Sequence, residues 1–173
     1  QANITISGTV TGPGGGAVDG VTVGAWLPTD EGANTTTDAS GNYQITLPAG
    51  EISMYVSPPF DDRLASRNLH LGMQNSTFTQ DFALVDGYLL EGTVRLPNGS
   101  APSNELWLNF SPQTFSIPDN EWLGTAVTPR DGKFQAVAPI GIYSLKIDPP
   151  PPYYPTSQPI DLRHGDVTNI VLT

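Results

Sequence analysis

Few side chains in this sequence could carry out chemistry. The two histidines, His70 and His164, stand far apart, in Leu69-His70-Leu71-Gly72 and Arg163-His164-Gly165-Asp166. A catalytic zinc site gathers about three protein ligands, and a hydrolytic triad needs a base beside a nucleophile, so two separated histidines supply neither. The absence of cysteine also excludes thiolate catalysis, disulfides and sulfur ligands. We therefore predict a protein that is not an enzyme and that needs no cofactor.

A cation site is conceivable at the adjacent carboxylates of Asp61 and Asp62. Calcium takes about six to eight oxygen ligands, usually from a loop with acidic residues at alternate positions. The sequence contains no such loop, and a solvated surface loop is the simpler interpretation of this pair. The prediction is that the chain holds no metal.

Aromatic side chains offer a better route to recognition. Trp26 and Trp107 each stand beside alternating apolar residues, so both point outward if those apolar residues point into a core. Exposed aromatic faces suit sugar rings, another protein surface or a glycan attached nearby, such as one on Asn109 beside Trp107. A loop or a neighbouring domain could equally cover them. Further aromatics stand in a long segment of the second half and after a run of prolines. The candidate contact surface comprises Trp26, Trp107, Phe115, Trp122, Tyr153 and Tyr154.

The proline run at residues 148–155 must be extended, because consecutive prolines fix φ and remove amide donors. It is either an exposed recognition loop or a rigid crossover between strands. A shorter version, residues 57–61, occupies the equivalent place in the first half of the chain. That correspondence favours the crossover.

Asparagines followed two residues later by Ser or Thr are unusually frequent, and export through a glycosylating pathway would explain the excess. A Thr-rich bacterial surface protein without sugars is the alternative. The chain also begins at Gln1 rather than at Met, as expected after removal of a signal peptide or for a segment of a larger protein. We predict an extracellular protein, with candidate attachment sites at Asn3, Asn34, Asn75, Asn98 and Asn109.

The elements that must position these residues occur twice. Gly8-Thr9-Val10 returns as Gly92-Thr93-Val94, and the turn at residues 38–43 returns at 130–134. Loop insertions between fixed strands explain the drift in spacing between the two copies. The sequence therefore predicts two domains of one type, with boundaries at residues 1–86 and 87–173.

Each copy consists of short predicted strands separated by turns. Residues 4–10, 21–26, 43–47 and 52–56 alternate apolar and polar side chains, and no segment has helical periodicity apart from a single turn near 61–65. The 18 glycines and 17 prolines fit many tight turns. About seven short strands per copy predict an all-β chain of two tandem antiparallel β-sandwiches of immunoglobulin-like or transthyretin-like type.

These landmarks resemble the carboxypeptidase regulatory-like family, also described as transthyretin-like or Cna-B-like. The resemblance consists of a G-T-V strand, a Gly-rich turn, a V-x-V strand, a D-x-x-G-x-Y/F hairpin and an L-P-A-G turn. It implies that Gly8 and Gly92 lie in first strands whose backbone is crowded by a neighbouring side chain, and that Tyr43 and Phe134 are core aromatics. Relatives with a Lys–Asn isopeptide bond have a lysine in the first strand. Neither first strand has one here, so no such crosslink is expected.

The junction between the copies is short. The last apolar segment of the first copy ends near Val85 and the next strand begins near Tyr88, which leaves only Asp86 and Gly87 between them. So short a link predicts a stiff, end-to-end arrangement. Both chain ends align with this junction, so we expect a head-to-tail fibre in which an edge strand such as residues 2–10 is lent to the neighbouring molecule.

Charge narrows the range of partners. The chain has 17 acidic and 7 basic residues, for a formal net charge of −10. Binding of nucleic acid needs clustered Lys and Arg to neutralise phosphates, so a nucleic-acid partner is not expected. No apolar run approaches the roughly 18 residues of a membrane span, so insertion into a membrane is not expected either.

The leading hypothesis is a secreted, non-enzymatic cell-surface protein with a structural or adhesive role, a rigid rod that forms a fibre subunit or part of a stalk. Its partners would be further copies of itself, other surface proteins or a polysaccharide. The alternative hypothesis is a carbohydrate-binding accessory module of a secreted protein. In that case the stacking platforms would be Trp26, Trp107, Trp122 or Tyr153 and Tyr154.

Overall fold

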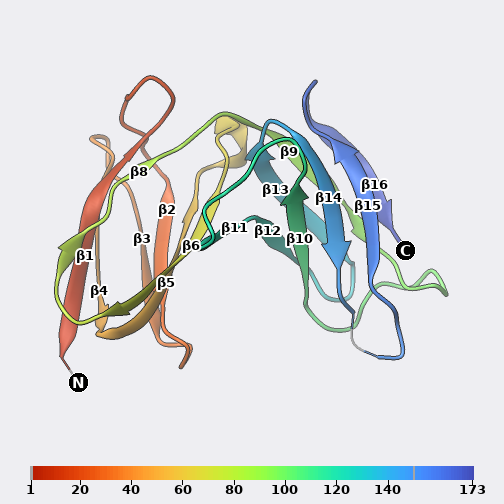
Figure 1. Cartoon of the computed structure of the whole chain (residues 1–173), viewed down its shortest axis with the longest axis horizontal. Helices are drawn as coiled ribbons and strands as arrows, with labels where there is room; N and C mark the ends of the chain where they lie inside the picture. Colours follow the sequence, from red (N-terminus) through yellow and green to blue (C-terminus); the bar gives the residue numbers. More distant parts are fainter. Residues whose placement is uncertain (1, 150) are drawn as a thin grey trace. The chain divides into compact units, whose positions relative to one another are not determined.

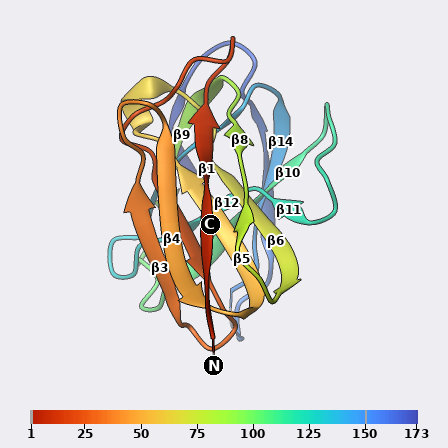
Figure 2. The ribbon, with the colours of Figure 1, turned by 90° about the vertical axis from the view of Figure 1, so that its left-hand side faces the viewer.

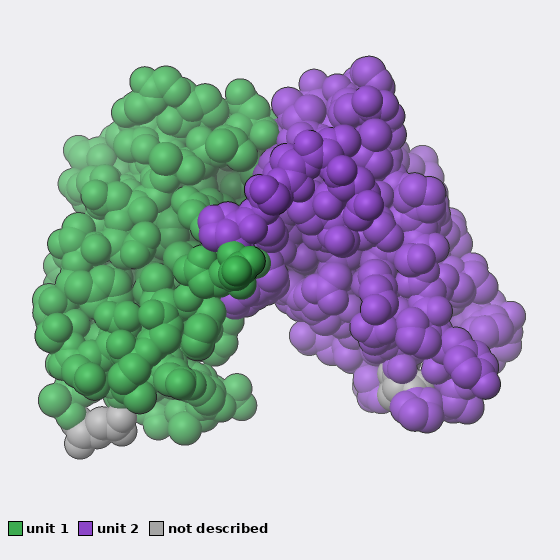
Figure 3. Space-filling view, in the orientation of Figure 1, with its two compact units in different colours: residues 1–86, 119–121 green, residues 87–118, 122–173 purple. Residues whose placement is uncertain are grey.

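The computed structural model describes residues 2–149 and 151–173. Gln1 lies outside the described residues, and so does Pro150, which belongs to the proline run. The chain divides into two units (Figure 3). Unit 1 comprises residues 1–86 and 119–121, and unit 2 comprises residues 87–118 and 122–173. Among the described residues, no helix has the length and apolarity that crossing a bilayer requires.

Unit 1 consists of strands and one short 3₁₀ turn, which confirms the all-β prediction (Figure 1). Successive residues of a strand face opposite sides of the sheet, so alternating apolar residues give each strand one inward face. The elements are β1 (Asn3–Thr11), β2 (Thr22–Trp26), β3 (Gly32–Thr36), β4 (Asn42–Pro48), β5 (Gly50–Ser57), η1 (Phe60–Asp62), β6 (Arg67–Gln74), β7 (Phe78–Thr79) and β8 (Phe82–Ala83).

The strands of unit 1 form two sheets. One sheet has the order β4-β1-β7, with β8 also paired to β1, and Figure 2 shows β4, β1 and β8 side by side. The other has the order β11-β6-β5-β2-β3, where β11 is Glu121–Trp122. Their inner faces enclose an apolar core that includes Ile4, Ile6, Val10, Val23, Tyr43, Ile45, Ile52, Met54, Val56 and Phe82.

Strand β1 lies inside its sheet, so the prediction that residues 2–10 form an edge strand is wrong. β1 pairs antiparallel with β4 on one side and parallel with β7 and β8 on the other. Its inward side chains Ile4, Ile6 and Val10 are at most 3% exposed. Lending β1 to a neighbour would break both pairings and expose this part of the core.

Unit 2 repeats the arrangement. Its strands are β9 (Gly87–Val94), β10 (Leu106–Pro112), β12 (Gly124–Val127), β13 (Lys133–Pro139), β14 (Ile142–Ile147), β15 (Thr156–Asp161) and β16 (Val167–Leu172). Its sheets have the orders β13-β9-β16 and β12-β10-β14-β15, so β9 takes the place that β1 has in unit 1. The core of unit 2 includes Leu90, Leu108, Phe134, Tyr143, Leu145 and Leu172.

Each unit also contains a parallel pairing that the alternation pattern did not predict. β8 runs parallel to β1 at Val10↔Phe82, and β16 runs parallel to β9 at Val94↔Leu172. The last strand of each unit therefore closes the sheet against the first strand. The sandwiches are mixed, rather than purely antiparallel.

The closing strand explains the glycine in each first strand. A Cβ on Gly8 would lie 2.0 Å from the carbonyl oxygen of Gln80, and one on Gly92 would lie 2.3 Å from that of Ile170. The nearest crowding atom is therefore a backbone oxygen of the closing segment, whereas the family resemblance implied a side chain. Tyr43 and Phe134 are buried in the cores, as the resemblance implied.

Replacement of Gly8 by alanine should destabilise unit 1. A new methyl group must displace the backbone at Gln80, and overpacking of this kind costs about 1–3 kcal/mol. Gly16→Ala is the matched control, because no atom lies within 4 Å of its added Cβ. Urea unfolding followed by circular dichroism measures both variants, and equal midpoints for the two would contradict the closing role of this segment.

Candidate functional site

The outer face of the β12-β10-β14-β15 sheet carries Trp107. This tryptophan is 42% exposed, whereas its neighbours Leu106 and Leu108 are buried in the core. A Cβ on Gly124 would lie 2.8 Å from Nε1 and 2.9 Å from Cε2 of Trp107. The indole therefore lies over a glycine of β12, and the small residue makes room for it.

A hydrogen bond fixes the edge of this indole. Nε1 of Trp107 donates to Oδ1 of Asn109 over 2.9 Å, between two residues on the same face of β10. Across the sheet, Asn109 stands opposite Lys146, which in turn stands opposite Ser157. The result is an oriented aromatic side chain beside a row of amide, ammonium and hydroxyl groups.

The corresponding face of unit 1 is built differently. Trp26 is only half-exposed and stands beside Tyr55, with ring centroids 5.8 Å apart and planes inclined by 39°. The Tyr55 ring lies over Gly24, where a Cβ would be 2.1 Å from Cε1. Here the aromatic side chains cover one another, so less of the Trp26 ring is free to receive a ligand.

The remaining aromatic candidates are scattered. Phe115 packs edge-on against the buried Tyr143 at a centroid distance of 5.8 Å, and Trp122 is half-buried in β11. Tyr153 is 36% exposed and Tyr154 is 88% exposed. These two tyrosines and neighbouring prolines line a cleft of about 420 Å³ in unit 2, together with Val94, Leu96, Leu106 and Ile147.

The two histidines lie in different units. Nδ1 of His70 is 3.0 Å from Oγ of Ser53 on an exposed part of the β5–β6 face, and His164 lies on the exposed loop before β16. Asp61 and Asp62 form the exposed end of η1. Within residues 2–149 and 151–173, no three His, Asp or Glu side chains are grouped as metal ligands.

Two buried tyrosines act as hydrogen-bond donors within the cores. Tyr143 donates its hydroxyl to the carbonyl oxygen of Pro139 over 2.5 Å, and Tyr43 donates to that of Gln80. Burial raises the pKa of both phenols well above the ordinary value, and the charge of Asp81 adds to the rise at Tyr43. Both hydroxyls therefore stay protonated and serve structure.

All five candidate glycosylation asparagines are exposed. Asn3 and Asn34 lie in strands β1 and β3, and Asn109 lies in β10. Asn75 comes directly after β6. Asn98 lies in a turn, where its Oδ1 accepts hydrogen bonds from both the amide and the hydroxyl of Ser100.

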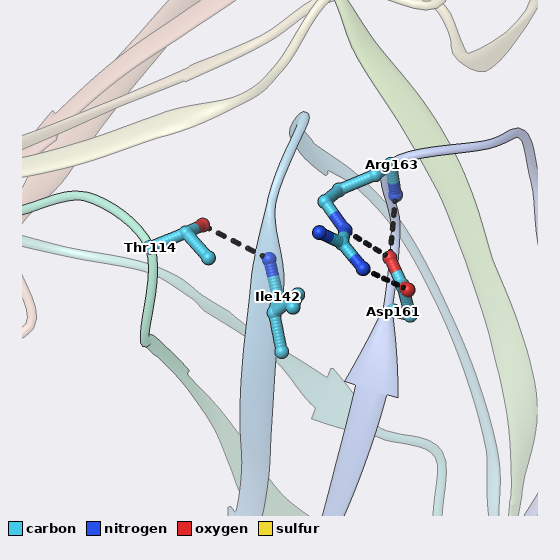
Figure 4. Close-up of polar contacts among 4 residues, drawn as sticks. All are labelled: Thr114, Ile142, Asp161 and Arg163. Carbon is cyan, nitrogen blue, oxygen red and sulfur yellow. Dashed lines mark hydrogen bonds and ion pairs between the residues drawn. The ribbon is translucent and has the colours of Figure 1, made fainter.

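A charged pair closes the loop after β15 (Figure 4). Arg163 donates from Nε and Nη2 to the two carboxylate oxygens of Asp161 at 2.9 and 2.8 Å. These hydrogen bonds lower the pKa of Asp161 to about 2. Figure 4 also shows Thr114, whose hydroxyl accepts the amide of Ile142 at 3.1 Å and so ties the long segment after β10 to the start of β14.

No sequence pattern indicates the contacts that residues 119–121 make with unit 1. Residues 119–121 group with unit 1, where the amide of His70 donates to the carbonyl of Asn120 over 2.7 Å. Asn120 returns a hydrogen bond to the carbonyl of His70, and Arg67 forms an ion pair with Glu121. Arg67 also lies over the Phe82 ring. Periodicity does not predict such contacts, because they join segments far apart in the chain.

The sequence of unit 1 matches a known family. Residues 5–85 match the family model of the carboxypeptidase regulatory-like domain. Unit 1 belongs to this family. The carboxypeptidase regulatory-like match ends before unit 2, whose strand pairing is nevertheless similar: β9 pairs with β13 and β16 as β1 pairs with β4 and β8.

Solved structures with similar folds share little sequence with this chain. The TIE protein of Bacillus anthracis is 14% identical over 99% of this chain and 34% of its own, with a TM-score of 0.40. A streptococcal ancillary pilin is 13% identical over 96% and 62%, with a TM-score of 0.36. The shaft pilin SpaA of Lactobacillus rhamnosus GG is 13% identical over 98% and 97%, with a TM-score of 0.35.

This chain thus spans about a third of the first of these proteins and less than two thirds of the second. No curated protein matches the sequence.

Loss of the Arg163 side chain should raise the pKa of Asp161. In the Arg163→Met variant, the pKa should return from about 2 toward the unperturbed value of about 3.9. A carboxylate with a lowered pKa stabilises the fold above about pH 4, and this contribution disappears as the pH falls toward 2. An NMR titration of the Asp161 carboxyl measures the shift, with Arg130→Met as the control. An unchanged midpoint in Arg163→Met would disprove the pairing.

Proposed function

We propose that this chain is a non-enzymatic, load-bearing spacer of an extracellular surface structure, and that it assembles head-to-tail into a fibre. The observation that carries the proposal is the parallel closure of each unit. Because the first and last strands run in the same direction, the chain enters each sandwich at one end and leaves it at the other. Units of this kind extend a structure when they are joined in series.

The same closure suits a protein under tension. In unit 1, the amide of Gln80 donates to Ser7 over 2.8 Å and the amide of Leu84 donates to Thr11 over 2.7 Å. In unit 2, the amide of Arg95 donates to Leu172 over 2.8 Å. Pulling on the two ends of a unit loads these bonds together, along the strands. Bonds that are loaded together resist more force than bonds that open one after another.

The junction supports the same function. Asp86 forms a β-bridge with Leu64 inside unit 1, and the next residue, Gly87, pairs with Pro139 inside unit 2. No residue between the units is therefore spare, in contrast to a flexible Gly/Ser tether. Such a link suits a spacer that passes force from one unit to the next.

The charge and surface chemistry are compatible with this role. A net charge of −10 keeps the separate molecules apart at low ionic strength, and the outer faces offer aromatic and polar groups for contacts. The partners we propose are further copies of the chain, with other surface proteins or a polysaccharide as secondary partners.

The alternative, a carbohydrate-binding module, has less support. The proposed stacking aromatics lie on separate elements: Trp26 packs beside Tyr55, Trp122 is half-buried, and Trp107 stands alone on its sheet face. A polysaccharide site of this type would use several aligned aromatic side chains on one face.

Native protein should form linear oligomers that lengthen with concentration. Sedimentation velocity should show a weight-average coefficient that rises with concentration, and rises further at higher salt, because screening weakens repulsion between acidic copies. Electron microscopy of the same samples should show unbranched fibres. Uniform monomers at every concentration and salt level would contradict the fibre.

A further inference from the structure

The exposed indole of Trp107 is held in a fixed orientation although it contacts little of the core. Gly124 leaves room beneath the ring, and the bond from Nε1 to Oδ1 of Asn109 fixes its edge. With 42% of the side chain exposed, part of the ring faces solvent. A large apolar surface fixed in this way on an otherwise polar sheet face suits a bound apolar or amphipathic group.

The same hydrogen bond determines how the amide of Asn109 is presented. An indole N–H can only donate, so the amide atom that faces Trp107 is the oxygen Oδ1. The nitrogen Nδ2 points away from this bond and stands on the exposed face of β10. Ser111, the third residue of the Asn109-Phe110-Ser111 triplet, lies on that face as well, because side chains two apart in a strand share a side.

The other four candidate sites are built differently. Asn34 is the nearest counterpart, because it pairs with Gly24, over which the Tyr55 ring lies. In Asn98-Gly99-Ser100, which forms a turn, the asparagine oxygen accepts a hydrogen bond from the Ser100 hydroxyl rather than from an indole. Only Asn109 has an aromatic residue two positions before it. At the other four sites, the residue in that position is Gln1, Gly32, Met73 or Leu96.

We propose that Asn109 carries an N-linked glycan and that the first pyranose ring of this glycan packs on Trp107. The donor is a lipid-linked oligosaccharide diphosphate. Nδ2 forms a bond to the anomeric carbon, the bond from that carbon to the diphosphate oxygen breaks, the diphosphate leaves with the electron pair, and Nδ2 releases one proton to a base.

Groups around Asn109 complement such a sugar. The C–H face of a pyranose is apolar and fits the indole, while its hydroxyls need polar partners. Lys146 stands opposite Asn109 in the neighbouring strand, and its ammonium lies 3.8 Å from the carboxylate of Asp148. A hydrogen-bond donor, the Lys146 ammonium, and an acceptor, the Asp148 carboxylate, are thus both available to the hydroxyls of the sugar.

Peptide mapping of the native protein tests attachment. Trypsin leaves Asn98 and Asn109 in one peptide, residues 96–130, but cleavage after Glu105 and Glu121 releases residues 106–121 with Asn109 as the only triplet asparagine. Enzymatic deglycosylation in H₂¹⁸O should convert Asn109 in this peptide into ¹⁸O-labelled aspartate. An unmodified peptide would overturn the proposal.

Melting temperatures test the contact with Trp107. Loss of one aromatic contact shifts the melting temperature of a domain of this size by several degrees. Deglycosylation should therefore lower the melting temperature of unit 2 in the wild type and leave it unchanged in Trp107→Ala. The control is Asn98→Gln, in which the loss on deglycosylation should remain. An equal loss in the wild type and in Trp107→Ala would overturn the packing claim.

A free sugar is the competing occupant of Trp107. If the peptide is unmodified and a neutral hexasaccharide such as cellohexaose quenches Trp107 fluorescence, the site binds a free ligand and the glycan proposal fails. The glycan proposal rests on the proposed function in one respect only: both require that the protein is exported from the cell. Fibres can form without a glycan at Asn109, and Asn109 can be glycosylated in a monomer, so the two can fail separately.

Discussion

The fold of each unit depends on the parallel pairing of its last strand with its first. This pairing makes β1 and β9 interior strands, with an antiparallel neighbour on one side and a parallel neighbour on the other. The backbone of the closing segment then passes so near Gly8 and Gly92 that a side chain has no room there. The same pairing sends the chain out of each unit at the end opposite its entry, and this geometry is the basis of the proposed spacer.

Glycine has a second use on the outer faces. Gly24 lies under Tyr55 in unit 1, and Gly124 lies under Trp107 in unit 2. In both places a missing Cβ lets an aromatic ring lie on the sheet. The surroundings of these rings differ between the units: Tyr55 pairs with Trp26 in unit 1, whereas Trp107 is left open beside an asparagine in unit 2. The two units therefore share a strand arrangement and differ in their outer surfaces.

Much of the fold was predictable from the sequence, because alternation and turn residues are local signals. The strands near residues 4–10 and 43–47 and the buried aromatics Tyr43 and Phe134 are found as expected. The parallel closure was not predictable. β7 and β8 have two residues each and carry no periodic signal, and the pattern of β16 indicates a strand but not its direction. The partial burial of Phe115 also escaped prediction, because its contact with Tyr143 forms only in the folded unit.

The load-bearing role depends on the direction in which unit 1 is pulled, and single-molecule force spectroscopy tests it most directly. The chain has no cysteine, so engineered pairs give unique attachment points. Pulling between Asn3→Cys and Val85→Cys loads the parallel bonds together, whereas pulling between Asn3→Cys and Glu51→Cys peels β1 from β4 at one end. We predict a clearly higher unfolding force for the first pair. Equal forces, or a lower force for the first pair, would contradict the account.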